Sequence, residues 1–163
     1  MTTCEVIEIT RKAFDSLNWR HHLDAGENVL VAWARGPDGD FALTVSVLEN
    51  PECLLVFGRL PFTVPETKRS QVVDAVNRAN FGLIIGFFEM NPETGRIYYE
   101  GTIPLKNAVL TVEQVANVLD TVAGAGAGYY RAFARLIYAN DVSPAEVIAE
   151  AEMAGRGQKA RLL

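Results

Sequence analysis

Two adjacent histidines are the residues of this chain that come nearest to a metal-ligand set. His21 and His22 lie close to Asp24 and Glu27 in the sequence, and histidine and carboxylate side chains are common zinc ligands. Neighbouring residues point in different directions on a helix or a strand, so the two imidazoles cannot readily share one metal. We expect a solvated pair in a polar connection, with a metal held together with Asp24 and Glu27 as the alternative. We predict no bound cofactor.

Catalysis would require a nucleophile or an acid–base pair in a recognisable activating context. No serine stands in a Gly-x-Ser-x-Gly turn, and neither the His-Glu-x-x-His nor the Cys-x-x-Cys spacing occurs. Asp38 and Asp40 fall in a turn, where aspartate is favoured for turn geometry alone. We therefore predict no catalytic residue and no enzyme. A triad assembled from distant residues is the alternative that the sequence leaves open.

A run of alternating alanine and glycine at residues 123–128 has a superficial likeness to a phosphate-binding loop. The dinucleotide-binding pattern needs a glycine three positions after Gly126, where a tyrosine stands, and no Lys-Ser or Lys-Thr pair follows. Glycine in a helix costs roughly 1 kcal/mol relative to alanine, a cost that close backbone approach can offset. Gly124 and Gly128 share one helical face, so we predict that they pack closely against the sheet or a partner helix. The rival interpretation is a break that divides residues 111–140 into two helices.

Composition excludes several classes of function. The chain has 163 residues and a net charge of −5, which argues against nucleic acid as a partner because phosphates demand a basic face. Its apolar runs are far shorter than the roughly 20 residues of a membrane span. Cys4 and Cys53 are too few and too far apart for a disulfide scaffold. Together with the lack of an export signal, this predicts a cytoplasmic protein with reduced thiols.

The elements that must position any functional residue follow from periodicity. Helical spacing of apolar residues predicts amphipathic helices over residues 4–17 and 66–80, another that begins after Thr111, and a short last helix at 143–154. Alternation and turn residues predict five strands, at 28–35, 41–48, 53–62, 83–90 and 96–104. The loop at 91–95 ends in a glycine suited to a left-handed position.

The fold class that follows is α+β, in the order α-β-β-β-α-β-β-α with a further C-terminal helix. We expect a five-stranded antiparallel sheet with helices packed on it. Residues 1–154 are predicted to form a single domain. Residues 155–163, which carry Arg156, Lys159 and Arg161, are predicted to form a basic, flexible tail.

This order of elements, together with Asn77-Arg78-Ala79-Asn80 and Tyr129-Tyr130-Arg131, resembles the YbjN family, whose fold is shared with type III secretion chaperones. The resemblance covers roughly residues 3–140. It implies a regulatory or chaperone-like protein without enzymatic activity. By analogy with the chaperones, it also implies a homodimer that binds a client protein along apolar patches and a sheet edge.

Several predicted strands carry more apolar residues than a half-exposed sheet requires. The segments 29–34, 53–57 and 83–88 are apolar on both faces, so we expect both faces of the central strands to be covered. The cover comes from the chain's own helices, from a second subunit or from a client segment. Large aromatic residues on strands are the type that anchors interfaces. The candidate contact residues are therefore Trp33, Phe57, Phe87 and Phe88, with Gly124 and Gly128 on the helix.

The sequence thus predicts a non-enzymatic, chaperone-like or regulatory protein-binding module that acts as a homodimer and binds an unidentified client. The alternative is a small-ligand sensor or an enzyme whose pocket lies between sheet and helices. The residues that would line such a pocket are Tyr98, Tyr99, Tyr129, Tyr130 and Arg131.

Overall fold

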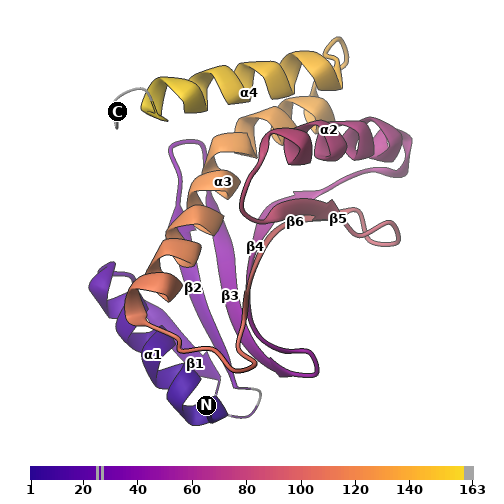
Figure 1. The fold of residues 1–163 in the computed structure, drawn as a ribbon. Coiled ribbons are helices and arrows are strands. Elements are labelled where there is room, and N and C mark those ends of the chain that lie inside the picture. Colours follow the sequence, from indigo (N-terminus) through magenta and orange to yellow (C-terminus); the bar gives the residue numbers. More distant parts are fainter. Residues whose placement is uncertain (25, 27, 160–163) are drawn as a thin grey trace.

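The strands make up one antiparallel sheet in the computed structural model, which describes residues 1–24, 26 and 28–159. The elements follow the order α1 (Thr3–Ser16), β1 (His21–Asp24), β2 (Val29–Arg35), β3 (Asp40–Glu49), β4 (Glu52–Thr63), α2 (Arg69–Gly82), β5 (Phe87–Met90), β6 (Arg96–Pro104), α3 (Val112–Tyr138) and α4 (Pro144–Lys159). A short 3-10 turn, Glu66–Lys68, precedes α2. The strands lie in the order β1-β2-β3-β4-β6-β5 (Figure 1).

The sheet has six strands, so the prediction of five was wrong by one. The additional strand, β1, pairs antiparallel with the first half of β2, from His21 opposite Ala32 to Asp24 opposite Val29. Its four residues include two histidines and an aspartate, which carry no strong strand signal by themselves. The segment is a strand because its backbone pairs with the free edge of β2.

The strand predicted over residues 83–90 forms only in its second half, as β5. Gly86 has a φ of +71°, and a Cβ there would lie 2.4 Å from the carbonyl oxygen of Glu100. This left-handed residue bends the chain between α2 and β5, so Leu83–Ile85 leave the sheet. Their apolar composition favours a strand, but the structure places them in the connection.

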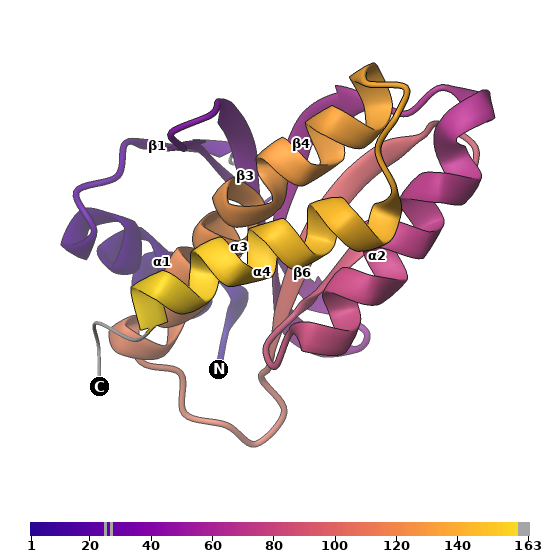
Figure 2. The same cartoon turned by 90° about the horizontal axis from the view of Figure 1, so that it is seen from above.

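All helices lie on one side of the sheet. Buried side chains alternate along the strands, as in Leu30, Ala32 and Ala34 of β2, and α1, α2 and α3 cover these positions. The last helix, α4, contacts α2 and α3 and forms an outer layer (Figure 2). Within the described residues the chain's own helices thus cover only one face of the central strands, and cover of the other face by a second subunit or a client segment stays a prediction.

Local signals at the helix ends are confirmed. Thr111 and Gln114 form the predicted capping box at the start of α3, because each side chain satisfies a backbone N–H that has no partner within the helix. Ser143 accepts a hydrogen bond from the Glu146 N–H, and Pro144 is the first residue of α4. A second capping box, Thr2 with Glu5, begins α1.

The glycine-rich segment is part of one continuous helix, so the alternative of two helices over residues 111–140 is excluded. The close contact is made by Gly126, where a Cβ would lie 2.6 Å from the Phe41 ring. Gly124 and Gly128 face open space, with no atom within 4 Å of the position that a Cβ would take. The close-packing prediction was right for the segment, but Gly124 and Gly128 do not pack against the sheet, because the buried side of α3 passes through Gly126. Packing of these two residues against a partner helix stays a prediction.

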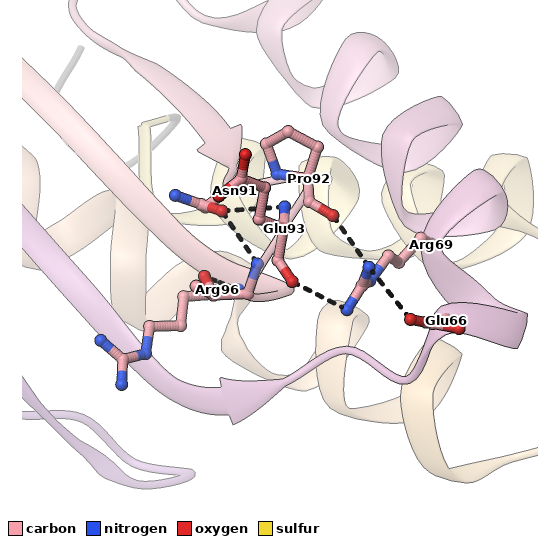
Figure 3. Close-up of polar contacts among 7 residues, drawn as sticks. Glu66, Arg69, Asn91, Pro92, Glu93 and Arg96 are labelled. Atoms are coloured by element: carbon pink, nitrogen blue, oxygen red, sulfur yellow. Dashed lines mark hydrogen bonds and ion pairs between the residues drawn. The ribbon is translucent and has the colours of Figure 1, made fainter.

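Arg69, the first residue of α2, holds the hairpin loop between β5 and β6 (Figure 3). Its guanidinium donates to the carbonyl oxygens of Pro92 at 2.8 Å and Glu93 at 3.3 Å. The Asn91 side chain accepts from the N–H groups of Glu93 and Thr94 at 2.9 Å. Gly95 has the predicted positive φ, +69°. The loop is therefore fixed both from within and from α2.

The last helix ends at Lys159, five residues beyond the expected end at Ala154. The rest of the predicted tail, residues 160–163, lies outside the described residues. No helix in the described ranges is both long enough and apolar enough to cross a membrane.

Candidate functional site

One face of the sheet carries no helix in the described structure, and we call it the open face. It consists of the strand residues that alternate with the buried ones. These are Val29, Val31, Trp33 and Arg35 of β2; Ala42, Thr44 and Ser46 of β3; Leu55, Phe57 and Arg59 of β4; Phe87 and Glu89 of β5; and Tyr98, Glu100 and Thr102 of β6.

Three of the predicted contact residues lie together on the open face. Trp33 is 66% exposed, Phe87 is 43% exposed and Phe57 is half-buried. The register places Phe57 opposite Thr44 on one side and opposite Glu100 on the other, and Glu100 in turn opposite Phe87. The sheet thus displays a row of large side chains across β4, β6 and β5, with Trp33 further along on β2.

The centre of this row is held by a ring contact. Phe57 meets Tyr98 edge to face, with ring centroids 6.0 Å apart and an interplanar angle of 74°. Such pairs add roughly 0.5–1.5 kcal/mol beyond the area they bury. The small side chains of β3, Ala42 and Thr44, lie between Trp33 and the Phe57 strand. The open face therefore combines fixed aromatic rings with a strip of small residues.

A carboxylate stands among these rings. Glu100 lies opposite both Phe57 and Phe87, and partial burial raises its pKa, with a smaller contribution from the charge of Glu89. Burial disfavours the ionised form because apolar neighbours replace water around the charge. The pKa of the Cys53 thiol is likewise raised, first by burial and then by Glu100.

Phe88 does not belong to this surface. It is 1% exposed and points into the core, where its ring contacts Tyr99, Tyr129 and Phe133. Alternation along β5 explains the difference, because neighbouring residues of a strand face opposite sides of the sheet. In this structure Phe88 is a core residue that is not accessible to a partner.

The backbone N–H and C=O of Phe88 lie at the outer edge of the sheet, and both form hydrogen bonds with the Asn80 side chain. The side chain of Asn80 donates to the Phe88 carbonyl at 2.9 Å and accepts from the Phe88 N–H at 2.7 Å. Asn80 is the last residue of the Asn77–Asn80 segment on which the family resemblance depends. Its side chain takes the place that a neighbouring strand would otherwise occupy.

A second apolar surface lies at the end of α2 and in the connection to β5, and the candidate contact residues did not include it. Phe81 is 96% exposed, Ile84 91% and Ile85 55%. The hydroxyl of the buried Tyr99 donates to the Ile85 carbonyl, and burial raises the pKa of Tyr99 to about 12. The signal for this surface is the apolar run of residues 83–88, whose composition is equally typical of a strand.

A cleft of about 690 Å³ lies at the outer edge of β2, where β1 has not yet begun. Its lining includes Trp19 and Arg20 from the α1–β1 connection and Trp33 and Arg35 from β2. The sequence allows Trp19 to be either a lid on the core or an exposed anchor. In the structure it is partly buried and packs beside Phe14, with ring centroids 6.4 Å apart.

The two histidines considered as metal ligands face different sides of β1, and Glu27 lies outside the described residues. His21 stacks on Phe14 at 5.1 Å while His22 is exposed on the other face of β1. The described residues contain no group of three or more potential ligands that could hold a metal.

The structure brings together only two residues of the alternative small-ligand pocket, Tyr99 and Tyr129, which both contact the Phe88 ring in the core. Tyr98 lies on the open face. Tyr130 contacts the Phe62 ring at 4.7 Å, and Arg131 lines a cleft between α3 and α4. These side chains do not form one pocket.

Gly124 and Gly128, the two helix positions among the predicted contacts, are exposed on α3. Gly128 lines the same cleft between α3 and α4 as Arg131. Their role in partner binding stays a prediction.

Solved structures share the fold of this chain, whereas no curated protein matches it. The crystal structure of "YbjN, a putative transcription regulator from E. coli" superposes with a TM-score of 0.58 at 14% identity, covering 78% of this chain and 91% of that one. The structure of the "HopA1-SchA Chaperone-Effector Complex" contains a chain with a TM-score of 0.51 at 18% identity, with coverage of 80% and 98%. At these identities the likeness shows a shared fold.

The sequence profile of the YbjN family, described as "Putative bacterial sensory transduction regulator", matches residues 7–135. The match includes the Asn80 contact, the open face and most of α3. It confirms the resemblance drawn from the sequence. The chain belongs to the YbjN family.

Proposed function

We propose that this protein is a non-enzymatic protein-binding module, chaperone-like or regulatory, whose partner lies across the open face. The observation that carries the proposal is the position of Trp33, Phe57 and Phe87 on one sheet face that no helix covers in the described structure. Exposed apolar patches of this kind mark interaction sites. Aromatic side chains supply much of the binding energy at such sites.

The geometry suits a protein segment better than a small molecule. The aromatic side chains are spread over β2, β4 and β5, and the strip of small residues on β3 lies between them. A small ligand needs a concave site that buries most of its surface, whereas a polypeptide can span several strands. The fold likeness to a chain of a chaperone–effector complex supports the same interpretation.

We further propose that two copies associate through the exposed segment of Phe81, Ile84 and Ile85. Burying these side chains against a second copy would favour association, because each Å² of apolar surface removed from water contributes about 25 cal/mol. Sedimentation velocity should give a dimer for the wild type and a monomer for Phe81→Ser/Ile84→Ser. A wild type that is monomeric at all accessible concentrations would contradict this part of the proposal.

The binding role is tested by replacing the phenylalanines of the open face with serine. Phe57→Ser/Phe87→Ser should reduce the partner protein retained from the native cell by at least tenfold, because two anchors are lost. Val109→Ser is the matched control, since Val109 is an exposed apolar residue in the loop before α3. Equal retention by the double variant and the control would contradict an open-face site.

The alternative function is tested separately. A panel of metabolites and nucleotides is screened by thermal shift, and a large stabilisation by one compound would favour a ligand sensor or an enzyme. The proposal predicts no such stabilisation.

A further inference from the structure

The outer edge of β2 is open over its last three residues. β1 pairs with Val29–Ala32 only, so Trp33, Ala34 and Arg35 have a strand neighbour on the β3 side and, within the described residues, none on the other. An unpaired strand edge presents N–H and C=O groups that can accept another strand. This stretch lies where the cleft of about 690 Å³ is found.

The side chains around that edge define the cleft chemically. Its lining includes Trp19, Arg20, Trp33, Arg35, Asp40 and Ala123, and we call it the edge cleft. Both tryptophans of the chain are among these residues. Their indole rings line the cleft beside the free edge.

The charge of the edge cleft is opposite to that of the protein. The chain has a net charge of −5, yet the cleft carries two arginines against one aspartate. Within the described structure, neither Arg20 nor Arg35 forms an ion pair. Arg35 lies opposite Asp40 in the register without bonding to it. Two unpaired guanidinium groups beside a free strand edge are complementary to a carboxylate.

The other edge of the sheet is closed at the corresponding point. The Asn80 side chain already holds both backbone groups of Phe88, with hydrogen bonds of 2.9 and 2.7 Å. A strand could not pair at Phe88 without displacing them. The free residues of β2 are therefore the better place for an added strand.

We propose that the edge cleft binds an extended peptide segment by strand addition to Trp33–Arg35, with an acidic side chain of that segment placed at Arg20 and Arg35. The inference rests on the proposed protein-binding function and names the chemistry of one bound segment. The main-chain hydrogen bonds provide affinity and the arginines provide selectivity.

The two tryptophans make the edge cleft directly observable. The probe is a nine-residue peptide of alternating valine and glutamate, blocked at both ends, titrated into the full chain while tryptophan fluorescence is followed. We expect a saturable change. The same peptide with lysine in place of glutamate should bind at least tenfold more weakly, because charge-assisted hydrogen bonds of about 1.5–3 kcal/mol are lost.

Two modifications test the two halves of the proposal. N-methylation of the central peptide amides, which removes the strand-pairing donors, should abolish the fluorescence change. Arg20→Glu/Arg35→Glu should reverse the preference toward the lysine peptide, while Lys106→Glu, at an exposed lysine in the loop between β6 and α3, should not. If the double charge reversal prevents folding, Arg20→Gln/Arg35→Gln should remove the preference without reversing it.

Several outcomes would overturn the proposal. Equal affinity for the glutamate and lysine peptides, or full binding by the N-methylated peptide, would exclude an acidic added strand. An equal fluorescence change with inorganic phosphate alone would assign the arginines to a small anion. The open-face test uses Phe57 and Phe87, which do not line the edge cleft. Failure of one proposal is therefore distinguishable from failure of the other.

Discussion

The side chain of Asn80 forms two hydrogen bonds with the backbone of Phe88, as donor to its carbonyl at 2.9 Å and as acceptor from its N–H at 2.7 Å. The contact ties the end of α2 to the edge strand β5. It also satisfies the polar groups that make an edge strand prone to pairing with other chains. A side chain of the motif that indicated the family thus protects one edge of the sheet.

Replacing Asn80 should both destabilise the fold and expose this edge. Asn80→Ala leaves two partly buried backbone groups without partners, and each such loss costs about 1–3 kcal/mol. Urea unfolding should show a decrease of at least about 1 kcal/mol and up to about 6 kcal/mol for the two groups together, and light scattering should show more self-association. Asn77→Ala is the control, because Asn77 is exposed one turn earlier on α2. A loss of stability equal in both variants would contradict the role assigned to Asn80.

The three glycines of α3 should respond to alanine in opposite directions. Gly124→Ala and Gly128→Ala place a methyl group in open space and should each stabilise the protein by up to roughly 1 kcal/mol. Gly126→Ala drives a Cβ to within 2.6 Å of the Phe41 ring, which is 1% exposed and also lies against Gly58. Overpacking costs about 1–3 kcal/mol, so this variant should be destabilised. Thermal unfolding of the three variants decides the sign, and a stable Gly126→Ala would refute the contact.

Ionisation of Tyr99 should lower the free energy of unfolding at alkaline pH. Its pKa is raised to about 12, first by burial and then by Tyr129. The folded state therefore holds the hydroxyl proton more tightly than the unfolded chain, whose tyrosine titrates near about 10. The stabilising contribution is complete below about pH 10 and is lost as the pH rises through about 12.

The variant Tyr99→Phe isolates this effect, because it removes the titrating group together with its hydrogen bond to the Ile85 carbonyl. At about pH 8 the variant should be less stable than the wild type by about 1 kcal/mol. That difference should shrink or reverse between about pH 10 and about pH 12. A difference that stays constant over this range would show that Tyr99 does not titrate as proposed.

Ionisation of Glu100 should likewise lower the free energy of unfolding as the pH rises, but at acidic pH. Its pKa is raised by burial and by Glu89, so its favourable contribution is present below the usual value and is lost as the pH rises through the folded-state value. Glu100→Gln should therefore raise the melting temperature at about pH 7 and lose that advantage near about pH 4. Glu49→Gln, at the exposed end of β3, is the control. An equal effect of both variants at neutral pH would contradict the environment described for Glu100.

Periodicity and turn chemistry were sufficient for most of the elements. The strand Arg96–Pro104 and the loop at 91–95 were predicted to the residue, because hairpin turns have strong local signals. The two elements that were wrong depend on distant neighbours. β1 is a strand only because β2 offers it an edge, and Leu83–Ile85 leave the sheet because Gly86 turns the chain.

The sequence predicted which types of residue form the candidate surface, but not which face of the sheet each of them lies on. Large aromatics on strands are exposed, as the prediction requires, at Trp33 and Phe87. The apolar run around Phe88 has no clean alternation, so nothing in the sequence separates the core residue from its exposed neighbour. The edge cleft could not be predicted at all, since it depends on the point where β1 ends along β2.

The central claim, that a protein partner lies across the open face, is tested most directly by site-specific photo-crosslinking in the native cell. A photoreactive phenylalanine analogue is placed at Phe57 or Phe87, and at Val109 as the control position outside the open face. The account predicts a discrete cross-linked polypeptide at positions 57 and 87 that is missing at 109. No cross-link at 57 and 87, or the same products at all three positions, would contradict it.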